Sequence, residues 1–230
     1  MPAGVRRCGV VRMADRSFDL IVFDWDGTLA DSTTVIAESL QRACRDLGCS
    51  VPGDVDARYV IGLGLADALR HIAPDLHVER YPDLSARYRD HFLSREEHIP
   101  LFDGALELLS ALRESGHRLA VATGKTRKGL DRALAFHRVA HLFDATRCAD
   151  EGRSKPDPEM LLHLLETLDV PRERALMVGD TTHDLEMAAR AGVAAVAMTH
   201  GAHGEHHLAR ATALRMFSSI QLLHRWLLAI

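Results

Sequence analysis

The sequence predicts an α/β protein with a doubly wound parallel sheet. The first observation behind this prediction is that short apolar runs alternate with helical patterns along much of the chain. The second is that these runs are almost continuously apolar and end in polar, glycine-containing loops, which is typical of buried parallel strands. The composition agrees, because 47% of the 230 residues are hydrophobic and 26% are charged, as in globular proteins with a sizeable core.

Four apolar runs are predicted to be strands, and helical patterns lie between and after them. The strands are expected at residues 18–23, 118–122, 175–178 and 193–198. The helices of the sheet region are expected at 105–114, 128–136, 158–168, 182–191 and 220–228. Gly116 and Gly192 follow two of these helices, at positions where a glycine commonly ends a helix.

The stretch from residue 32 to residue 100 breaks the alternation. Its patterns are all helical, at 34–47, 65–72 and 82–95, and about seventy residues are too many for an ordinary crossover. We therefore expect a helical domain at 32–100 whose two ends return near Ala30 and Leu101. The core domain would then comprise residues 18–31 and 101–230. Residues 1–17 are expected to form a flexible tail, in which Met13 is a second candidate start.

Charge, hydropathy and cysteine content exclude several classes of protein. A net charge of −4 and a pI near 6.4 give no reason to expect a nucleic-acid partner. No apolar run approaches the roughly 20 residues of a membrane-spanning helix, so no membrane association is expected. The four cysteines lack the paired spacing of a disulfide framework or a zinc site. These features favour a reduced, cytoplasmic setting.

Chemistry-bearing side chains stand just after the predicted strands or at a helix entry. They are Asp24 and Asp26 after the first strand, Thr123, Gly124 and Lys125 after the second, Lys155 before the helix at 158–168, and Asp180, Thr181, Thr182, His183 and Asp184 after the strand at 175–178. Because open α/β sheets bind ligands at the carboxyl ends of their strands, we expect these groups to meet at one edge.

This grouping predicts phosphoryl-transfer chemistry. Carboxylates that converge on one spot repel one another, and a bound divalent cation relieves the repulsion; all-oxygen ligands suit magnesium. Asp24 can act as the nucleophile and pass through an aspartyl-phosphate. Asp26 points the same way in extended backbone, so it can protonate the leaving oxygen and then activate water. Thr123 and Lys155 can hold the transferred phosphoryl group.

The segments DWDGTLADS, VATGK, SKPDP and GDTTHD resemble, in order and spacing, the four motifs of the haloacid dehalogenase superfamily. The resemblance covers residue 18 to about residue 198. It implies a Rossmann-like core with Asp24 as nucleophile and Asp26 as general acid/base. It also implies a magnesium ion held by Asp24, the main-chain carbonyl of Asp26, and Asp180. Asp184 would support this metal site.

The same resemblance extends to the substrate side. The insert at 32–100 resembles the C1 cap of subfamily IA, and within that group the chain is most similar to phosphoglycolate phosphatases. The resemblance implies that Thr123, Gly124 and Lys155 contact the phosphate group. Gly62 and Gly64 are expected to form a substrate loop of the cap or, alternatively, a helix-entry turn. We therefore expect a phosphoric monoester hydrolase that takes a small-molecule phosphate ester, with 2-phosphoglycolate as leading candidate, and that is a monomer or homodimer.

Two other reactions of the superfamily are disfavoured by single residues. Dehalogenases resemble this chain but have an aromatic residue where Asp26 stands. Phosphonatases place alanine at that position and need a Schiff-base lysine from the cap. Since no lysine occurs between Asp31 and Phe102, that chemistry lacks its nucleophile here.

Two alternatives stay open behind the phosphatase prediction. A β-phosphoglucomutase-like enzyme would carry a KGxSR-like segment in its cap, whereas residues 61–65 read IGLGL and lack the lysine and the arginine. A non-catalytic phosphate-binding relative would be expected to lose Asp24, Asp26 or Asp180, and all three are present.

Three further features are ambiguous in the sequence. The histidines at 200, 203, 206 and 207 could bind a transition metal, but a solvated loop is favoured. Trp25 is expected to point away from the flanking aspartates and fill the core. Candidate substrate contacts from the insert are Arg58, Arg70 and His71.

Overall fold

The computed structural model describes residues 18–230, so the predicted tail at 1–17 and the candidate start at Met13 lie outside the described residues. The described chain forms a six-stranded parallel sheet in the order β3-β2-β1-β4-β5-β6. The strands are β1 (Leu20–Phe23), β2 (Arg118–Thr123), β3 (Ala145–Cys148), β4 (Ala175–Gly179), β5 (Ala194–Met198) and β6 (Arg215–Phe217). The strand order reverses direction at β1, as in a doubly wound sheet, and the predicted fold class is confirmed.

The sheet has two strands more than the sequence predicts. β3 reads ATRC and β6 reads RMF, and both lie at the sheet edges. An edge strand pairs on one side only and is less fully covered than a central strand. Its sequence therefore needs no continuous apolar run, which is the signal on which the four central strands were predicted.

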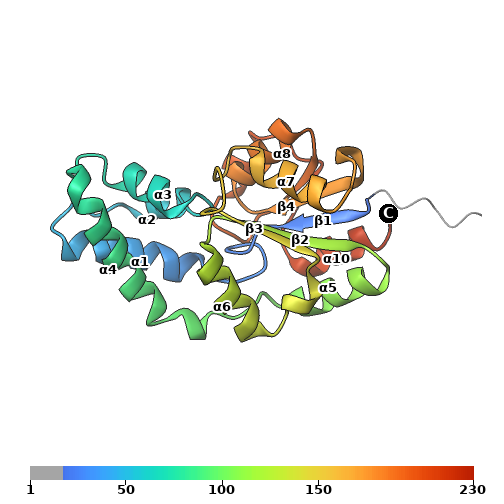
Figure 1. Ribbon diagram of the computed structural model, residues 1–230, viewed down its shortest axis with the longest axis horizontal. Coiled ribbons are helices and arrows are strands. Elements are labelled where there is room, and N and C mark those ends of the chain that lie inside the picture. The colour runs from blue at the N-terminus through green and yellow to red at the C-terminus, as the bar shows by residue number, and fades with distance from the viewer. Residues whose placement is uncertain (1–17) are drawn as a thin grey trace, which may run out of the picture.

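Helices cover both faces of the sheet (Figure 1). Their bounds are α5 (Ala105–Glu114), α6 (Arg127–His137), α7 (Glu159–Thr167), α8 (Thr182–Ala191), the short α9 (Glu205–Leu208) and α10 (Ile220–Leu227). Ile21 and Phe23 of β1 pack in the cluster that includes α5, α6 and α10. Leu20 and Val22 point the other way, into the cluster that includes α7 and α8. This two-sided burial is why β1 is apolar at every position.

Residues between β1 and β2 form the helical insert. Its helices are α1 (Thr33–Asp46), α2 (Asp54–Tyr59), α3 (Leu65–Ile72) and α4 (Tyr81–Leu93). Single 3₁₀ turns lie at Val78–Arg80 and Glu96–His98 in the insert and at Ala140–Leu142 and Arg172–Arg174 in the core. Figure 1 shows the insert beyond the carboxyl ends of the strands. The chain leaves and returns at neighbouring points, where Ala30 forms a bridge with Leu101.

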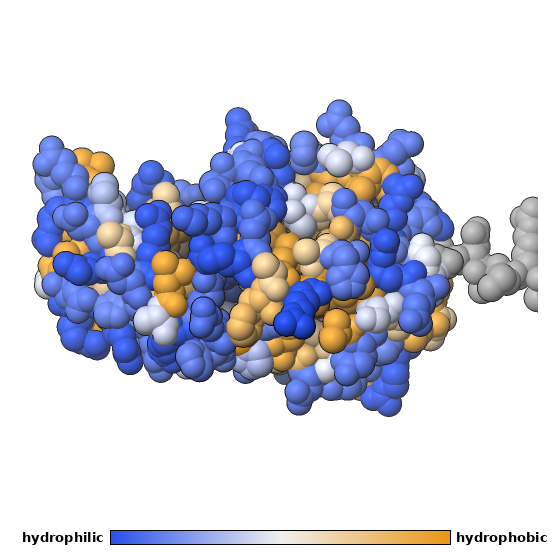
Figure 2. Space-filling model, turned by 60° about the horizontal axis from the view of Figure 1, so that its bottom comes forward, coloured by the Kyte–Doolittle hydropathy of each residue, from blue (hydrophilic) through white to orange (hydrophobic). Residues whose placement is uncertain are grey.

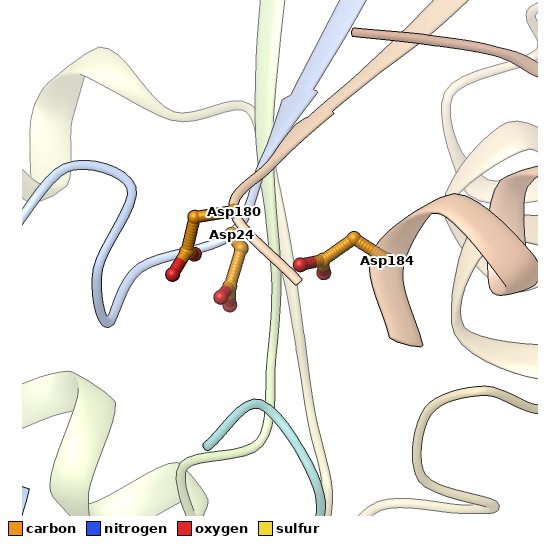
Figure 3. A group of neighbouring side chains, drawn as sticks. All are labelled: Asp24, Asp180 and Asp184. Atoms are coloured by element: carbon orange, nitrogen blue, oxygen red, sulfur yellow. The ribbon is translucent and has the colours of Figure 1, made fainter. Parts of the chain in front are cut away.

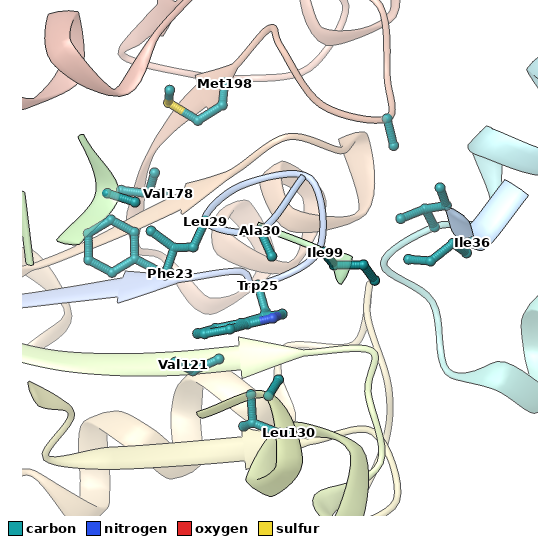
Figure 4. Packing of buried hydrophobic residues seen from close by; sticks show 14 of the residues in the cluster. Phe23, Trp25, Leu29, Ala30, Ile36, Ile99, Val121, Leu130, Val178 and Met198 are labelled. Carbon is teal, nitrogen blue, oxygen red and sulfur yellow. The ribbon is translucent and has the colours of Figure 1, made fainter. Parts of the chain in front are cut away.

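Trp25 fills the core, as the sequence predicts. The residue is 1% exposed, and Figure 4 shows its indole among Leu29, Val121 and Leu130. Because adjacent residues of an extended segment point to opposite sides, burying Trp25 directs Asp24 and Asp26 away from this cluster. The indole thus helps to aim the two carboxylates.

The surface differs between the two parts of the molecule. Figure 2 shows that hydrophobic side chains gather more densely over the core half than over the inserted helices. Within residues 18–230, no helix combines the length and apolar character that a bilayer crossing requires. Cys44, Cys49 and Cys148 are unpaired, so the described part of the chain contains no disulfide.

Candidate active site

Three carboxylates converge at the carboxyl edge of the sheet (Figure 3). Asp24 follows β1, Asp180 follows β4, and Asp184 lies in the first turn of α8. Each offers an oxygen atom that lies within 4.8 Å of those of the other two, and all three residues are buried. Segments more than 150 residues apart are therefore brought together by the neighbouring positions of β1 and β4 in the sheet.

Lys155 lies among these carboxylates. Its Nζ is 2.7 Å from Asp24 Oδ1 and 2.7 Å from Asp184 Oδ1, and its side chain is buried. Burial by itself would lower the pKa of Lys155, but the charges of Asp184 and Asp24 outweigh it and raise that pKa above its usual value. The side chain is therefore a permanent ammonium that connects the nucleophile candidate to α8.

The carboxylates bear an unbalanced negative charge. Burial raises the pKa of Asp24 well above its usual value; Lys155 opposes the rise, and Asp184 and Asp180 add to it. Burial and the charge of Asp184 raise the pKa of Asp180 to about 7. Three carboxylates beside one ammonium leave two formal negative charges, which is the charge that one divalent cation neutralises.

The donor set fits a magnesium ion. Asp24 Oδ2 is buried and has neither a hydrogen-bond nor an ion-pair partner among residues 18–230. A buried carboxylate oxygen without a partner is costly unless a cation or a ligand meets it. The available donors are all oxygen atoms, as magnesium prefers.

Asp180 is seated by small residues and by two donors. Thr28 Oγ1 donates to its Oδ1 at 2.7 Å, and the backbone N–H of Ala202 donates to its Oδ2 at 2.6 Å. A Cβ atom at Gly27, where φ is +85°, or at Gly201 would collide with this carboxylate. The two glycines therefore let the backbone approach Asp180 closely, and its carboxylate has a fixed orientation.

Asp184 has a structural task as well as an electrostatic one. Its Oδ2 accepts hydrogen bonds from the Thr181 backbone N–H at 3.1 Å and from Thr181 Oγ1 at 2.7 Å. Thr181 in turn caps α8, which makes a reciprocal capping box. The N-cap of α8 is thus Thr181. Asp184 Oδ2 is bound by Thr181 at the helix N-cap, and its Oδ1 lies against Lys155 Nζ. Asp184 is therefore placed to orient the Lys155 ammonium.

Asp26 faces a different environment from Asp24. Its Oδ1 accepts a hydrogen bond from Ser32 Oγ at 2.8 Å and lies 3.0 Å from Lys125 Nζ. Its Oδ2 has no partner in the described chain, and its side chain is 10% exposed. One carboxylate oxygen is thus held while the other is open toward a cavity.

That cavity has a volume of about 440 Å³ and lies between the insert and the core. Asp26, Gly124 and Lys125 line it from the core. From the insert it is lined mainly by apolar side chains, together with Tyr88, Arg89 and Glu96. A smaller cavity of about 260 Å³ adjoins it beside Asp26 and Phe92. A third, of about 840 Å³, lies on the side of Ser154 and Arg70.

The predicted phosphate contacts lie close to the carboxylates. Thr123 is buried at the end of β2, and its Oγ1 accepts a hydrogen bond from the Lys125 backbone N–H at 3.2 Å. A Cβ atom at Gly124 would collide with the carbonyl oxygen of Leu63, so the insert loop lies directly on this turn. Gly62 lines the 440 Å³ cavity, whereas Gly64 precedes α3 and lines the third cavity. Their role as a substrate loop stays a prediction.

The histidine group is only partly the solvated loop that the sequence favours. His206 and His207 are exposed on α9, but His203 is 2% exposed. Its Nδ1 accepts from the Thr182 backbone N–H at 3.0 Å, so its Nε2 carries the proton and donates to the Tyr59 carbonyl at 3.0 Å. The solvated interpretation is wrong for His203 because its ring stacks on Tyr59 with centroids 5.3 Å apart and bonds the carbonyl of the same residue, 144 residues away. No transition-metal grouping is formed by histidines in residues 18–230.

The candidate contacts from the insert lie elsewhere. Arg58 donates to Asp54 and to Thr33, outside the three cavities described above. The ring of His71 packs against Tyr59 with centroids 5.1 Å apart. Arg70 borders the third cavity and pairs with Asp67 at 2.9 Å. Arg70 thus shares the third cavity with Gly124 and Lys155, whereas Arg58 and His71 line none of the three cavities. The role of the three side chains as substrate contacts stays a prediction.

Three contributors to the site were not singled out in the sequence as site residues. They are Thr28, Ser32 and Tyr88. Thr28 and Ser32 belong to the first motif, so their positions beside Asp26 were a usable signal. Tyr88 carried no such signal, because it reaches the cavity through the packing of α4 against α1.

Comparison with known proteins agrees with this geometry. The family model described as haloacid dehalogenase-like hydrolase matches residues 21–198. The chain is 37% identical over 191 residues to "Probable phosphatase IndB" of Dickeya dadantii, covering 80% of this chain and 82% of that one. It is 34% identical over 201 residues to a phosphoglycolate phosphatase of Vibrio cholerae, covering 83% and 88%.

Solved structures lead to the same family. The crystal structure of "a predicted phosphatase" from Clostridium acetobutylicum is similar with a TM-score of 0.82 and 25% identity, covering 93% of this chain and 99% of that one. The prediction of a phosphatase agrees with the names of these relatives. The resemblance drawn from four short motifs is confirmed, and the chain belongs to the haloacid dehalogenase-like hydrolase family.

Proposed function

We propose that this phosphatase hydrolyses a phosphate monoester of a small molecule with the help of magnesium and through an aspartyl-phosphate on Asp24. The proposal rests on the burial and contacts of the Asp24 carboxylate. Its carboxylate is buried, one oxygen lies 2.7 Å from the Lys155 ammonium, and the other has no partner in the described residues. A carboxylate with an open oxygen beside a fixed cation is suited to attack an electrophilic anion.

The residues that would hold magnesium are Asp24, the main-chain carbonyl of Asp26, and Asp180. The ion would neutralise the carboxylates and the phosphoryl oxygens when it is bound. Asp184 supports this arrangement by orienting Lys155. We also propose that residues 32–100 act as a cap domain on a core of residues 18–31 and 101–230. We further propose that the protein acts in the cytoplasm.

The side chains of the site can supply the nucleophile and the proton transfers for both steps of the reaction. Asp24 forms a bond to phosphorus while the bond from phosphorus to the leaving oxygen breaks, and Asp26 donates a proton to that oxygen. Asp26 then takes a proton from water as the water oxygen attacks the aspartyl-phosphate. Inorganic phosphate leaves and Asp24 is restored. Lys155 and Thr123 hold the phosphoryl oxygens in both steps.

The leading candidate substrate is 2-phosphoglycolate, which is supported by the resemblance of the motifs and by the name of the Vibrio cholerae relative. It is the reference compound for any assay.

The proposal is tested by phosphate release from a panel of phosphate esters, with magnesium and with EDTA. We expect turnover with magnesium, none in chelator, and a loss of about 10⁴-fold or more in kcat for Asp24→Asn. Asp75→Asn is the matched control, because Asp75 is an exposed aspartate of the insert. Turnover that survives Asp24→Asn or persists in EDTA would contradict the mechanism. Conversion of a sugar phosphate without phosphate release would favour the mutase.

A further inference from the structure

The leaving group of the substrate must lie beside Asp26. This inference rests on the proposed function, in which Asp26 protonates the leaving oxygen. The 440 Å³ cavity receives both Asp26 and Gly124, and Gly124 directly follows the phosphate-contact candidate Thr123. The cavity therefore adjoins the predicted phosphoryl position. Its volume falls in the range of about 300–1,000 Å³ that is typical of pockets for drug-sized ligands.

The insert wall of this cavity is mainly apolar, although Arg89 and Glu96 also line it. It is formed mainly by Ile36 and Leu40 of α1, Leu65 and Ala68 of α3, and Phe92 and Leu93 of α4. Such a wall is favourable only if the ligand displaces water from it. A two-carbon acid has almost no apolar surface to offer and would leave most of the cavity filled with water.

The cations lining the cavity also fit glycolate poorly. Lys125 is 3.0 Å from Asp26, and Arg132 is 2.8 Å from Glu96, so both are already paired. Arg89 and Lys128 have no ion pair within the described chain, but they are exposed. The carboxylate of glycolate lies only two bonds from the ester oxygen. It would have to compete with Asp26 for Lys125.

Two aromatic rings form one side of the cavity. Tyr88 and Phe92 are four residues apart on α4, and their ring centroids are 5.9 Å apart at an interplanar angle of 21°. The Nζ of Lys125 lies 4.8 Å from the Phe92 centroid. Aromatic rings beside an aliphatic wall suit a flat group that packs against them.

Tyr88 adds one polar group to this mainly apolar wall. Its hydroxyl forms no hydrogen bond within the part of the chain that the structure describes. Burial raises the pKa of Tyr88, and the nearby charges of Asp26 and Glu96 raise it further, so the hydroxyl stays protonated. Because Tyr88 lines the cavity, this hydroxyl can donate a hydrogen bond to a ligand atom there.

We propose that the physiological substrate is a phosphate monoester of a ring-bearing alcohol, whose flat ring packs against Phe92 and the aliphatic wall and whose edge carries a polar atom for the Tyr88 hydroxyl. Two sources share this chemistry, nucleoside monophosphates and phosphorylated aryl alcohols. The cavity selects the ring and Tyr88 selects its polar edge.

The test compares kcat/KM for four kinds of ester: 2-phosphoglycolate, benzyl phosphate, pyridoxal 5′-phosphate and the nucleoside 5′-monophosphates. We expect at least one ring-bearing ester to exceed 2-phosphoglycolate by about tenfold or more. The last three arms distinguish a plain ring, a polar aryl ring and a nucleobase. Tyr88→Phe should lower kcat/KM for the polar rings and spare the ratio of benzyl phosphate to 2-phosphoglycolate.

A filling substitution tests the cavity itself. Leu65 is partly exposed, so Leu65→Trp can place its indole in the cavity without rebuilding the core. We expect the ratio of ring-bearing ester to 2-phosphoglycolate to fall by about tenfold. Leu162→Trp is the matched control, because Leu162 is an exposed leucine of α7 away from the cavity. Calorimetric binding of the same esters to Asp24→Asn gives a second readout that needs no turnover.

The outcomes separate this inference from the proposed function. Preference for 2-phosphoglycolate, or an equal effect of Leu65→Trp on all esters, overturns the ring-bearing substrate and leaves the Asp24 mechanism intact. Failure of every ester to release phosphate in an Asp24-dependent way overturns the mechanism. In that case, tight binding of a ring-bearing ester to Asp24→Asn still supports the cavity assignment, and weak binding removes it.

Discussion

The core edge and the insert wall meet across one cavity but are built in opposite ways. On the core side, charged groups hold one another: Lys155 lies 2.7 Å from both Asp24 and Asp184. On the insert side, the wall is mainly aliphatic and aromatic, with one hydroxyl, from Tyr88, and two charged side chains, Arg89 and Glu96. The difference separates two tasks. Fixed charges stabilise a phosphoryl group of constant shape, whereas apolar packing selects a leaving group that differs between relatives.

Removing the central charge should have the largest effect. Lys155→Met leaves Asp24 and Asp184 facing each other without a cation, and breaking a buried pair in this way costs about 3–5 kcal/mol. We expect kcat/KM to fall by about 10²–10³-fold or more, because the phosphoryl group also loses a donor. Steady-state kinetics and urea unfolding measure the two effects.

The control for this change is Arg42→Met. Arg42 forms an exposed pair with Glu38 at 3.9 Å, and such a pair contributes less than about 1 kcal/mol. If Lys155→Met were as stable and as active as Arg42→Met, the ammonium would not be what holds the core edge together.

The contact between His203 of the core and Tyr59 of the insert should make the stability of the protein depend on pH. Burial is the main cause that lowers the pKa of His203 from 6.5 to about 4. Between these values the unfolded chain binds a proton that the folded chain excludes. The stability contributed by neutral His203 is therefore complete above pH 6.5 and is lost as the pH falls toward 4.

His203→Gln removes this dependence. We compare the free energy of unfolding of the wild type with that of His203→Gln. This difference should change in favour of the variant by up to about 3 kcal/mol between pH 7 and pH 4. Urea unfolding in EDTA measures it without a contribution from bound metal. The exposed His206 provides the control His206→Gln, whose pH profile should follow the wild type. Parallel profiles for both variants would show that the His203 contact with Tyr59 does not exclude the proton.

The sequence predicts the core edge far better than the insert wall, and the reason is physical. Asp24 and Asp180 follow strands that are apolar because both faces are covered, so local pattern locates them. The edge strands β3 and β6 lack that pattern. Tyr88 and His203 depend on distant partners, since α4 packs on α1 and His203 meets a carbonyl 144 residues away. No local signal records such a contact.

The smallest expected effect concerns how closely the two regions approach. A Cβ atom at Gly124 would collide with the backbone carbonyls of Leu63 and Gly62, which cannot rotate aside as a side chain can. Gly124→Ala should therefore push the insert loop away from the core edge at a cost of about 1–3 kcal/mol. The charges around Asp24 keep their mutual contacts, so kcat should change less than KM.

Gly204→Ala is the matched control, because a Cβ atom there meets nothing within 4 Å. Raising KM by about tenfold in Gly124→Ala alone would show that substrate is enclosed by the insert while the core does the chemistry. An equal fall in kcat for 2-phosphoglycolate and for larger esters, with KM unchanged, would mean that the loop at 62–64 aligns the reacting groups themselves. The insert would then contribute to catalysis as well as to substrate binding.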